Sequence, residues 1–153
     1  MFVIDGSGSI EQAGRGNFDL IKNFVKSVIG GFRIGFENTH VGVLIFSSSQ
    51  YVRVIFGLET YYNTEQLNNA IDAIRYPSGG TYTAKALRIA RTQILSASQD
   101  RDDKPNVVIV ITDGKATDSE QLDRAATALR GQETTIIAVG VGENYERDRK
   151  SVV

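Results

Sequence analysis

The segment Asp5-Gly6-Ser7-Gly8-Ser9 carries one carboxylate and two hydroxyl groups at alternate positions, directly after the apolar run Phe2-Val3-Ile4. A short buried strand is therefore predicted to end at Asp5, and the two glycines permit a tight turn after it. Oxygen atoms gathered on such a turn are the ligands that a hard cation such as Mg²⁺ prefers. The segment predicts a cation site at the rim of a sheet.

Two further segments offer oxygen ligands. Asp113 follows the apolar run Val107–Ile111, and Thr81 and Thr83 lie in a Gly-Gly-Thr-Tyr-Thr stretch ahead of a predicted helix. Two carboxylates and several hydroxyls, without a cysteine or a neighbouring histidine, favour Mg²⁺ or Mn²⁺ over zinc. Each segment alone is typical of an ordinary turn or of a helix start with Thr83 as N-cap. Their combination is much more specific.

Alternating strand and helix patterns predict the framework that would bring these segments together. The predicted strands are Phe2–Asp5, Val41–Phe46, Tyr51–Phe56, Val107–Ile111 and Ile136–Val139. Helical stripes of apolar residues run from Phe18 to Val28, Leu67 to Ile74, Leu87 to Ile94 and Leu122 to Leu129. Such strand–helix–strand units indicate an α/β fold with a doubly wound, mostly parallel sheet and helices on both faces.

Local signals add detail to this framework. The link Ser47–Gln50 is too short for a parallel crossover, so Tyr51–Phe56 is predicted to be an antiparallel edge strand. Gly30-Gly31 should end the first long helix, Asn63 with Gln66 should form a capping box, and Ser119 should cap the last helix. Since ligands of such sheets bind beyond the carboxyl ends of the strands, all the oxygen-bearing segments are expected on one rim.

Composition limits the class of protein. The chain has 153 residues, a net charge of −1 and no cysteine. This length predicts one domain with a substantial core, spanning residues 1–153. The balanced charge argues against a nucleic-acid surface or a polybasic membrane anchor, and no apolar run is long enough to span a membrane. Because Met1 leads almost directly into a predicted core strand, we expect a piece of a larger multidomain protein.

The oxygen-bearing residues resemble the metal-ion-dependent adhesion site of von Willebrand factor type A domains. The family's Asp-x-Ser-x-Ser motif is matched by Asp5, Ser7 and Ser9, its threonine by Thr81, and its second aspartate by Asp113. The resemblance covers nearly the whole chain. Within the family, the sequence is most similar to that of matrix members such as the matrilins and collagen-associated proteins.

The resemblance implies how such a site works. Ser7, Ser9 and Thr81 would offer hydroxyl oxygens, and Asp5 and Asp113 would act largely through coordinated water. The ion would stay under-neutralised and attract a carboxylate of a protein partner, for example collagen or another matrix protein. The implied location is extracellular, without membrane insertion or nucleic acid. Selectivity would come from the rim segments Ile10–Arg15, Tyr82, Lys115–Asp118 and Glu143–Tyr145.

The chain departs from the family pattern at its C-terminal end. Only Glu143–Val153 follow Gly142, which is too short for the expected final strand and helix. We therefore expect a C-terminally truncated fold that leaves Ile136–Val139 as an exposed edge, and the helix-based affinity switch of integrin-type members is not assumed.

Enzymatic alternatives fit the residues poorly. Phosphotransferases of the haloacid dehalogenase type need a second aspartate where Ser7 stands, and a dinucleotide fingerprint would need glycine at Glu11. A serine nucleophile needs a base, whereas His40, the sole histidine, begins an apolar strand and is interpreted as a structural or solvated side chain. We expect no enzyme. The remaining alternative is an intracellular assembly module of the same family with a mainly structural metal site.

Overall fold

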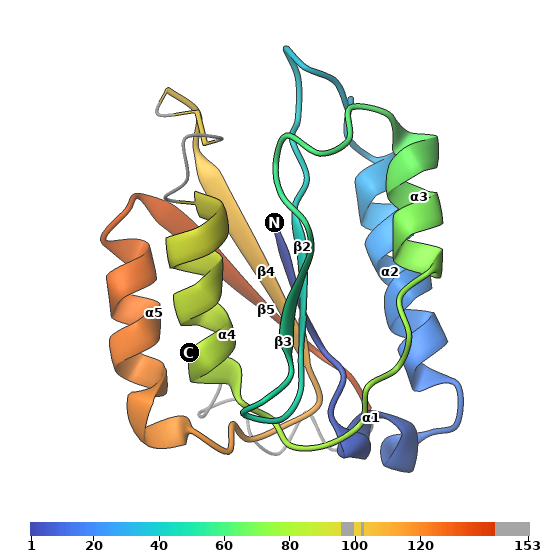
Figure 1. Cartoon of the computed structure of the whole chain (residues 1–153), viewed down its shortest axis with the longest axis vertical. Coiled ribbons are helices and arrows are strands. Elements are labelled where there is room, and N and C mark those ends of the chain that lie inside the picture. Colours follow the sequence, from blue (N-terminus) through green and yellow to red (C-terminus); the bar gives the residue numbers. More distant parts are fainter. Residues whose placement is uncertain (96–99, 102, 143–153) are drawn as a thin grey trace.

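The computed structural model describes residues 1–95, 100–101 and 103–142. A five-stranded sheet forms its centre, in the order β3-β2-β1-β4-β5 (Figure 1). The strands are β1 (Phe2–Asp5), β2 (Val43–Phe46), β3 (Val52–Phe56), β4 (Asn106–Thr112) and β5 (Thr134–Gly140). All five strands coincide with predicted ones to within a few residues at each end.

Strand pairing follows the predicted pattern. β1 pairs parallel with β2 on one side and β4 on the other, and β4 pairs parallel with β5. Only β3 runs antiparallel, against β2, as the short link between them requires. The α/β fold with one antiparallel edge strand is therefore confirmed.

Helices cover both faces of the sheet. Figure 1 shows α2 and α3 on one side of the strands and α4 and α5 on the other. The helical elements are α1 (Gly8–Ala13), α2 (Asn17–Gly30), α3 (Thr64–Asp72), α4 (Thr83–Ile89), the π-helical turn η1 (Ala90–Leu95), the 3₁₀ turn η2 (Ser119–Gln121) and α5 (Leu122–Arg130).

Two apolar clusters fill the space between the sheet and these helices. In β1, Phe2 and Ile4 face the cluster under α2 and α3, while Val3 faces the cluster under α4 and α5. Successive strand residues point to opposite faces, so a strand buried on both sides must be apolar throughout. This explains why the central strands read as unbroken apolar runs.

The helix ends agree only in part with their predicted signals. Gly31 caps α2, as expected. Asn63 caps α3 by accepting a hydrogen bond from the Glu65 amide, but Gln66 makes no reciprocal bond among the described contacts, so the capping box is incomplete. The prediction that Ser119 caps the last helix is wrong: Ser119 begins η2, and α5 starts only at Leu122.

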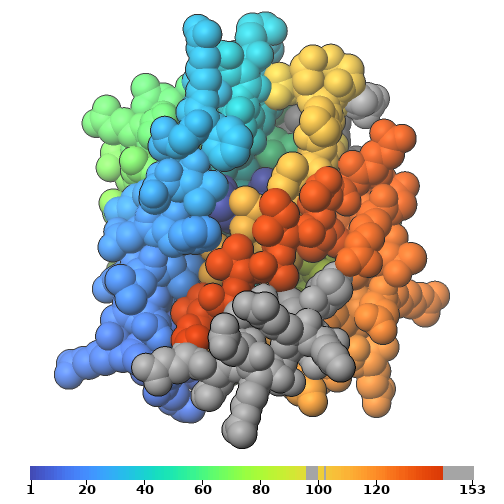
Figure 2. Space-filling view, turned by 180° about the vertical axis from the view of Figure 1, so that it is seen from behind, coloured from blue at the N-terminus to red at the C-terminus, as the bar shows by residue number. Residues whose placement is uncertain are grey.

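β5 is the edge strand of the described sheet, as expected. Its residue Ile137 is 45% exposed, and Figure 2 shows part of this strand on the molecular surface beside α2. The expectations about Glu143–Val153 fall outside the described residues. No helix within the described ranges is long and apolar enough to span a membrane.

Candidate metal centre

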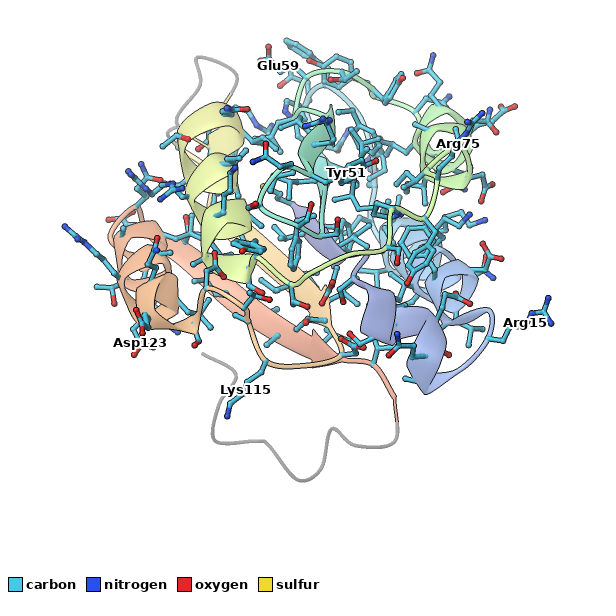
Figure 3. All side chains as sticks on the ribbon, turned by 60° about the horizontal axis from the view of Figure 1, so that its bottom comes forward. Arg15, Tyr51, Glu59, Arg75, Lys115 and Asp123 are labelled. Atoms are coloured by element: carbon cyan, nitrogen blue, oxygen red, sulfur yellow. The ribbon has the colours of Figure 1, made fainter. Side chains whose placement is uncertain are left out.

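The topology of the sheet places the two key strand ends side by side. β1 and β4 are parallel neighbours, with Ile4 opposite Ile111. Asp5 and Thr112 are thus the last residues of adjacent strands, and Asp113 follows one position later. Parallel alignment is what brings residues more than a hundred positions apart to one rim. Figure 3 turns this rim toward the viewer.

Asp5 is the buried anchor of the site. Its side chain is 0% exposed, and each carboxylate oxygen accepts one hydrogen bond: Oδ1 from the Ser7 amide at 2.8 Å and Oδ2 from the Thr112 hydroxyl at 2.6 Å. Burial raises the pKa of Asp5 to about 6, although both hydrogen bonds act in the opposite direction, and the nearby charge of Asp113 adds to the rise. Keeping Asp5 ionised in the folded protein therefore costs free energy.

A chain of hydrogen bonds connects the predicted ligands near Asp5. The hydroxyl oxygens of Ser7 and Ser9 are 3.0 Å apart, and the Ser9 hydroxyl donates to Asp113 Oδ1 at 3.0 Å. Ser7 is buried, Asp113 is half-buried and Ser9 is exposed. The donor atoms therefore extend from the protein interior to solvent, which leaves an open side for a ligand.

Thr81 reaches the same rim on a separate loop. Its backbone is fixed from both sides by Thr117, whose hydroxyl accepts from the Thr81 amide at 3.1 Å and whose amide donates to the Thr81 carbonyl at 2.7 Å. The preceding Gly79 carbonyl accepts from the Gly8 amide at 2.9 Å, which joins this loop to α1. Among the described contacts, the Thr81 hydroxyl makes no hydrogen bond with Asp5, Ser7, Ser9 or Asp113.

Gly6 permits the close approach of that loop. A Cβ atom at this position would lie 2.6 Å from two carbon atoms of the Pro77 ring, and Tyr76 donates its hydroxyl to the Ser7 carbonyl at 2.7 Å. The segment before Thr81 is thus packed directly on the Asp5–Ser9 turn. Only glycine fits this contact without displacement.

Gly6→Ala is accordingly expected to destabilise the protein by about 1–3 kcal/mol, because the added methyl must push the Pro77 ring away. Chemical denaturation checks this expectation. Gly30→Ala is the matched control, because a Cβ at Gly30 meets nothing within 4 Å. Equal stability of Gly6→Ala and wild type would contradict the proposed tight packing of the loop.

Several positioning residues were not predicted from the sequence. Thr112 orients Asp5, and Thr117 holds the Thr81 backbone. Asp118 caps α4: its carboxylate accepts from the amides of Ala84 at 3.0 Å and Lys85 at 2.8 Å. The only available signal was their position: Thr112 ends β4, and Thr117 and Asp118 lie in the segment Lys115–Asp118 that was expected at the rim.

Two expectations about the rim need correction. Thr83 is not the N-cap of α4; Tyr82 holds that position, and the buried Thr83 hydroxyl has no hydrogen-bond partner among the described residues. Ile10–Arg15 is mostly helix α1 rather than a loop, with Ile10 fully buried in the core. Arg15 remains exposed, whereas Glu143–Tyr145 lies outside the described residues.

His40 lies apart from this rim, near the amino end of β2. Its Nε2 atom is 2.8 Å from the Phe36 carbonyl oxygen, and its ring packs against Tyr62 with centroids 5.2 Å apart. The only histidine of the chain is therefore engaged in local packing, as the sequence interpretation held.

The donor set fits a hard divalent cation. The described residues contain no group of three or more His, Cys, Asp or Glu side chains that could hold a metal, so a zinc-type cluster is not formed there. Two carboxylates accompanied by hydroxyls suit an ion that accepts oxygen and water ligands. Moreover, Asp5 is fully buried yet has no Lys, Arg or His ion-pair partner among the described residues. A cation beside it would supply the missing positive charge.

Comparison with known proteins identifies relatives of this chain. The sequence profile described as von Willebrand factor type A domain matches residues 1–152. The human collagen alpha-5(VI) chain is 39% identical over 142 residues, which cover 92% of this chain and 5% of the collagen chain. Mouse matrilin-2 is 31% identical over 156 residues, covering 99% of this chain and 16% of the matrilin. The chain thus corresponds to a small part of each relative.

A solved structure is also similar. The proximal thread matrix protein 1 from the mussel byssus, described with a zinc occupied MIDAS motif, superposes with a TM-score of 0.82 at 29% identity. The match covers 93% of this chain and 35% of that protein. The collagen and matrilin relatives are extracellular matrix proteins, which supports the expected extracellular location.

Proposed function

Because this chain belongs to the von Willebrand factor type A domain family, we propose that it is a cation-dependent adhesion module. The five residues Asp5, Ser7, Ser9, Thr81 and Asp113 would bind one divalent cation, and the cation would bind an acidic side chain of a partner protein. The observation that carries the proposal is the hydrogen-bonded series from buried Asp5 through Ser7 and Ser9 to Asp113.

The residues would divide the work according to their exposure. The hydroxyls of Ser7 and Ser9 lie 3.0 Å apart and are neutral ligands, while Asp5 supplies charge from the interior. Asp113 stands half-buried at the solvent side. Mg²⁺ is the proposed ion, with Mn²⁺ as an equivalent, because both take such oxygen sets. When bound, the ion supplies a positive charge that attracts a carboxylate.

The surroundings favour an acidic partner. Arg15 and Lys115 are exposed on the side of the molecule that carries the rim, and Figure 3 shows both projecting outward. Their positive charges would steer a carboxylate-bearing ligand and reject a basic one. A matrix protein such as a collagen is the proposed partner, in keeping with the matrix relatives.

Catalysis is not part of the proposal. The rim holds no described histidine or lysine within hydrogen-bond distance of Ser7 or Ser9, and those hydroxyls bond to each other and to Asp113. An activated serine needs a neighbouring base to accept its proton, and Asp113 accepts from Ser9 at the surface without a third group to orient it. The relatives are matrix proteins rather than enzymes.

Binding to immobilised collagens and other matrix proteins tests the adhesion function. With Mg²⁺ we expect binding that falls by about tenfold or more after chelation or in Asp113→Ala, because the bridging ion is then lost. Asp123→Ala is the matched control, since Asp123 is exposed at the start of α5. Binding that persists unchanged in chelator would overturn the metal-bridged mechanism and favour an assembly module instead.

A further inference from the structure

A hollow of about 300 Å³ lies between α4 and α5, on the face of the sheet opposite α2 and α3. Figure 1 shows these two helices running side by side at one flank of the molecule. We call this hollow the arginine groove. Its principal lining residues are Ala84, Arg88, Arg91, Arg124, Ala125 and Ala128.

Helical spacing explains why three arginines converge here. Arg88 and Arg91 are three positions apart and therefore share one face of the α4–η1 segment. Arg124 belongs to the facing helix α5, with Ala128 one turn further along. The alanines leave space between the helices, so the long arginine side chains border a hollow rather than fill it.

The three guanidinium groups are unpaired in the described structure, although Glu120 and Asp123 lie next to Gln121 and Arg124 in the sequence. The segment Thr83–Leu95 contains no acidic residue, and none of the three guanidinium groups forms an ion pair with a described carboxylate. Asp118, an acidic residue near the start of α4, is already engaged with two backbone amides. Because the whole chain has a net charge of −1, this cluster does not reflect a general excess of basic residues.

The chemistry of the lining narrows the class of ligand. Guanidinium groups match the oxygen atoms of sulfate, phosphate and carboxylate groups through paired hydrogen bonds. The groove offers no aromatic or large aliphatic pocket to anchor a peptide side chain, only alanine methyls and Gln121 between the arginines. Interfaces with peptides usually need such an apolar anchor. A ligand whose affinity comes from closely repeated anionic groups fits this surface better.

We propose that the arginine groove binds a sulfated polysaccharide. The groove shares no residue with the proposed cation ligands, so this binding requires no metal ion. The matrix location of the relatives makes such polyanions available to the chain. Electrostatic attachment of this kind weakens as salt screens the charges.

The test uses immobilised heparin and a heparin octasaccharide in solution, both in chelator and at several NaCl concentrations. The variant Arg88→Gln/Arg91→Gln/Arg124→Gln is expected to bind about tenfold or more weakly than wild type. The control Arg33→Gln/Arg53→Gln/Arg75→Gln removes the same charge from exposed arginines outside the groove and should stay within about twofold. Circular dichroism melts establish that all three proteins are folded.

Two results would overturn the proposal: wild type that fails to bind heparin in chelator, or a control variant that loses as much affinity as the groove variant. Polyglutamate is the competing probe. If it binds as tightly as the octasaccharide and depends equally on the groove, the site takes acidic peptides rather than sulfated polysaccharide. Mg²⁺ titration of the groove variant should match wild type. A negative heparin result therefore does not count against the proposed cation site, and a negative cation result does not count against the groove.

Discussion

Asp113→Ala should weaken Mg²⁺ binding by about 100-fold or more while leaving the fold nearly as stable as before. The expected loss is large because Asp113 provides one of only two carboxylates in the proposed ligand set. The structural cost is small because Asp113 is half-buried and its side chain has one described hydrogen bond, from the Ser9 hydroxyl. The substitution therefore separates ion binding from folding.

Calorimetric titration of chelator-treated protein with Mg²⁺ and Mn²⁺ measures this loss directly. Wild type should show about one site per chain, as expected for a single cluster of oxygen ligands. Asp123→Ala, which removes an exposed carboxylate on α5, should titrate like wild type. If Asp113→Ala binds the ion as tightly as wild type does, the assignment of the centre is wrong.

The sequence predicts where the strands end and that their ends share one rim, because two general rules apply to α/β sheets. An apolar run in an α/β chain marks a strand buried on both faces, and ligands collect beyond the carboxyl ends of parallel strands. Asp5 and Asp113 each follow such a run, so their meeting on one rim required no knowledge of side-chain contacts. The link before β3 was short enough to dictate its antiparallel direction.

Other features were hidden because they depend on contacts between distant segments. Asp118 caps α4 from 33 or 34 positions away, so no spacing within the helix sequence could reveal it. The same contact explains why Thr83 does not act as the N-cap. Helix α1 has only six residues and one buried side chain, Ile10, which is too little for a recognisable periodic stripe.

The position of Thr81 shows that matching the sequence motif does not by itself form a complete site. Its backbone is fixed by Thr117, and its loop is joined to α1 through Gly8 and Gly79. The hydroxyl makes no described bond to the other four residues of the proposed centre. A cation would give these five side chains a common partner, which motif matching alone does not provide.

Asp5→Asn is expected to weaken Mg²⁺ binding, as Asp113→Ala does, but to raise the stability of the metal-free fold. Asp5 is fully buried without a cationic side-chain partner among the described residues, so its charge destabilises the metal-free fold. Asparagine has the same shape, retains an oxygen acceptor for the Ser7 amide, and its amide group can donate to the Thr112 hydroxyl. The variant should therefore be more stable than wild type in chelator, yet bind Mg²⁺ at least about 100-fold more weakly.

The pH dependence of this gain follows from the raised pKa. Burial raises the pKa of Asp5 from 3.8 to about 6, so between these values the folded state holds a proton that the unfolded state has released. The free energy of unfolding of the metal-free wild type therefore decreases as pH rises through that window, and the decrease is complete above about pH 6. At about 1.4 kcal/mol per pKa unit, the upper limit is about 3 kcal/mol, and weaker hydrogen bonds in the variant reduce the gain to about 1–3 kcal/mol at pH 7.

Urea denaturation of wild type and Asp5→Asn in chelator, at pH 4 and pH 7, measures this difference. The advantage of the variant should be small at pH 4 and full at pH 7, and Asp113→Asn should show little advantage at either pH because its carboxylate reaches solvent. At 100 times the wild-type dissociation constant, Mg²⁺ should then stabilise wild type by about 2.7 kcal/mol and Asp5→Asn by no more than about 0.4 kcal/mol. A variant no more stable than wild type in chelator at pH 7 would mean that the protein already compensates the Asp5 charge, and a cation would no longer be needed to explain a buried carboxylate at this rim.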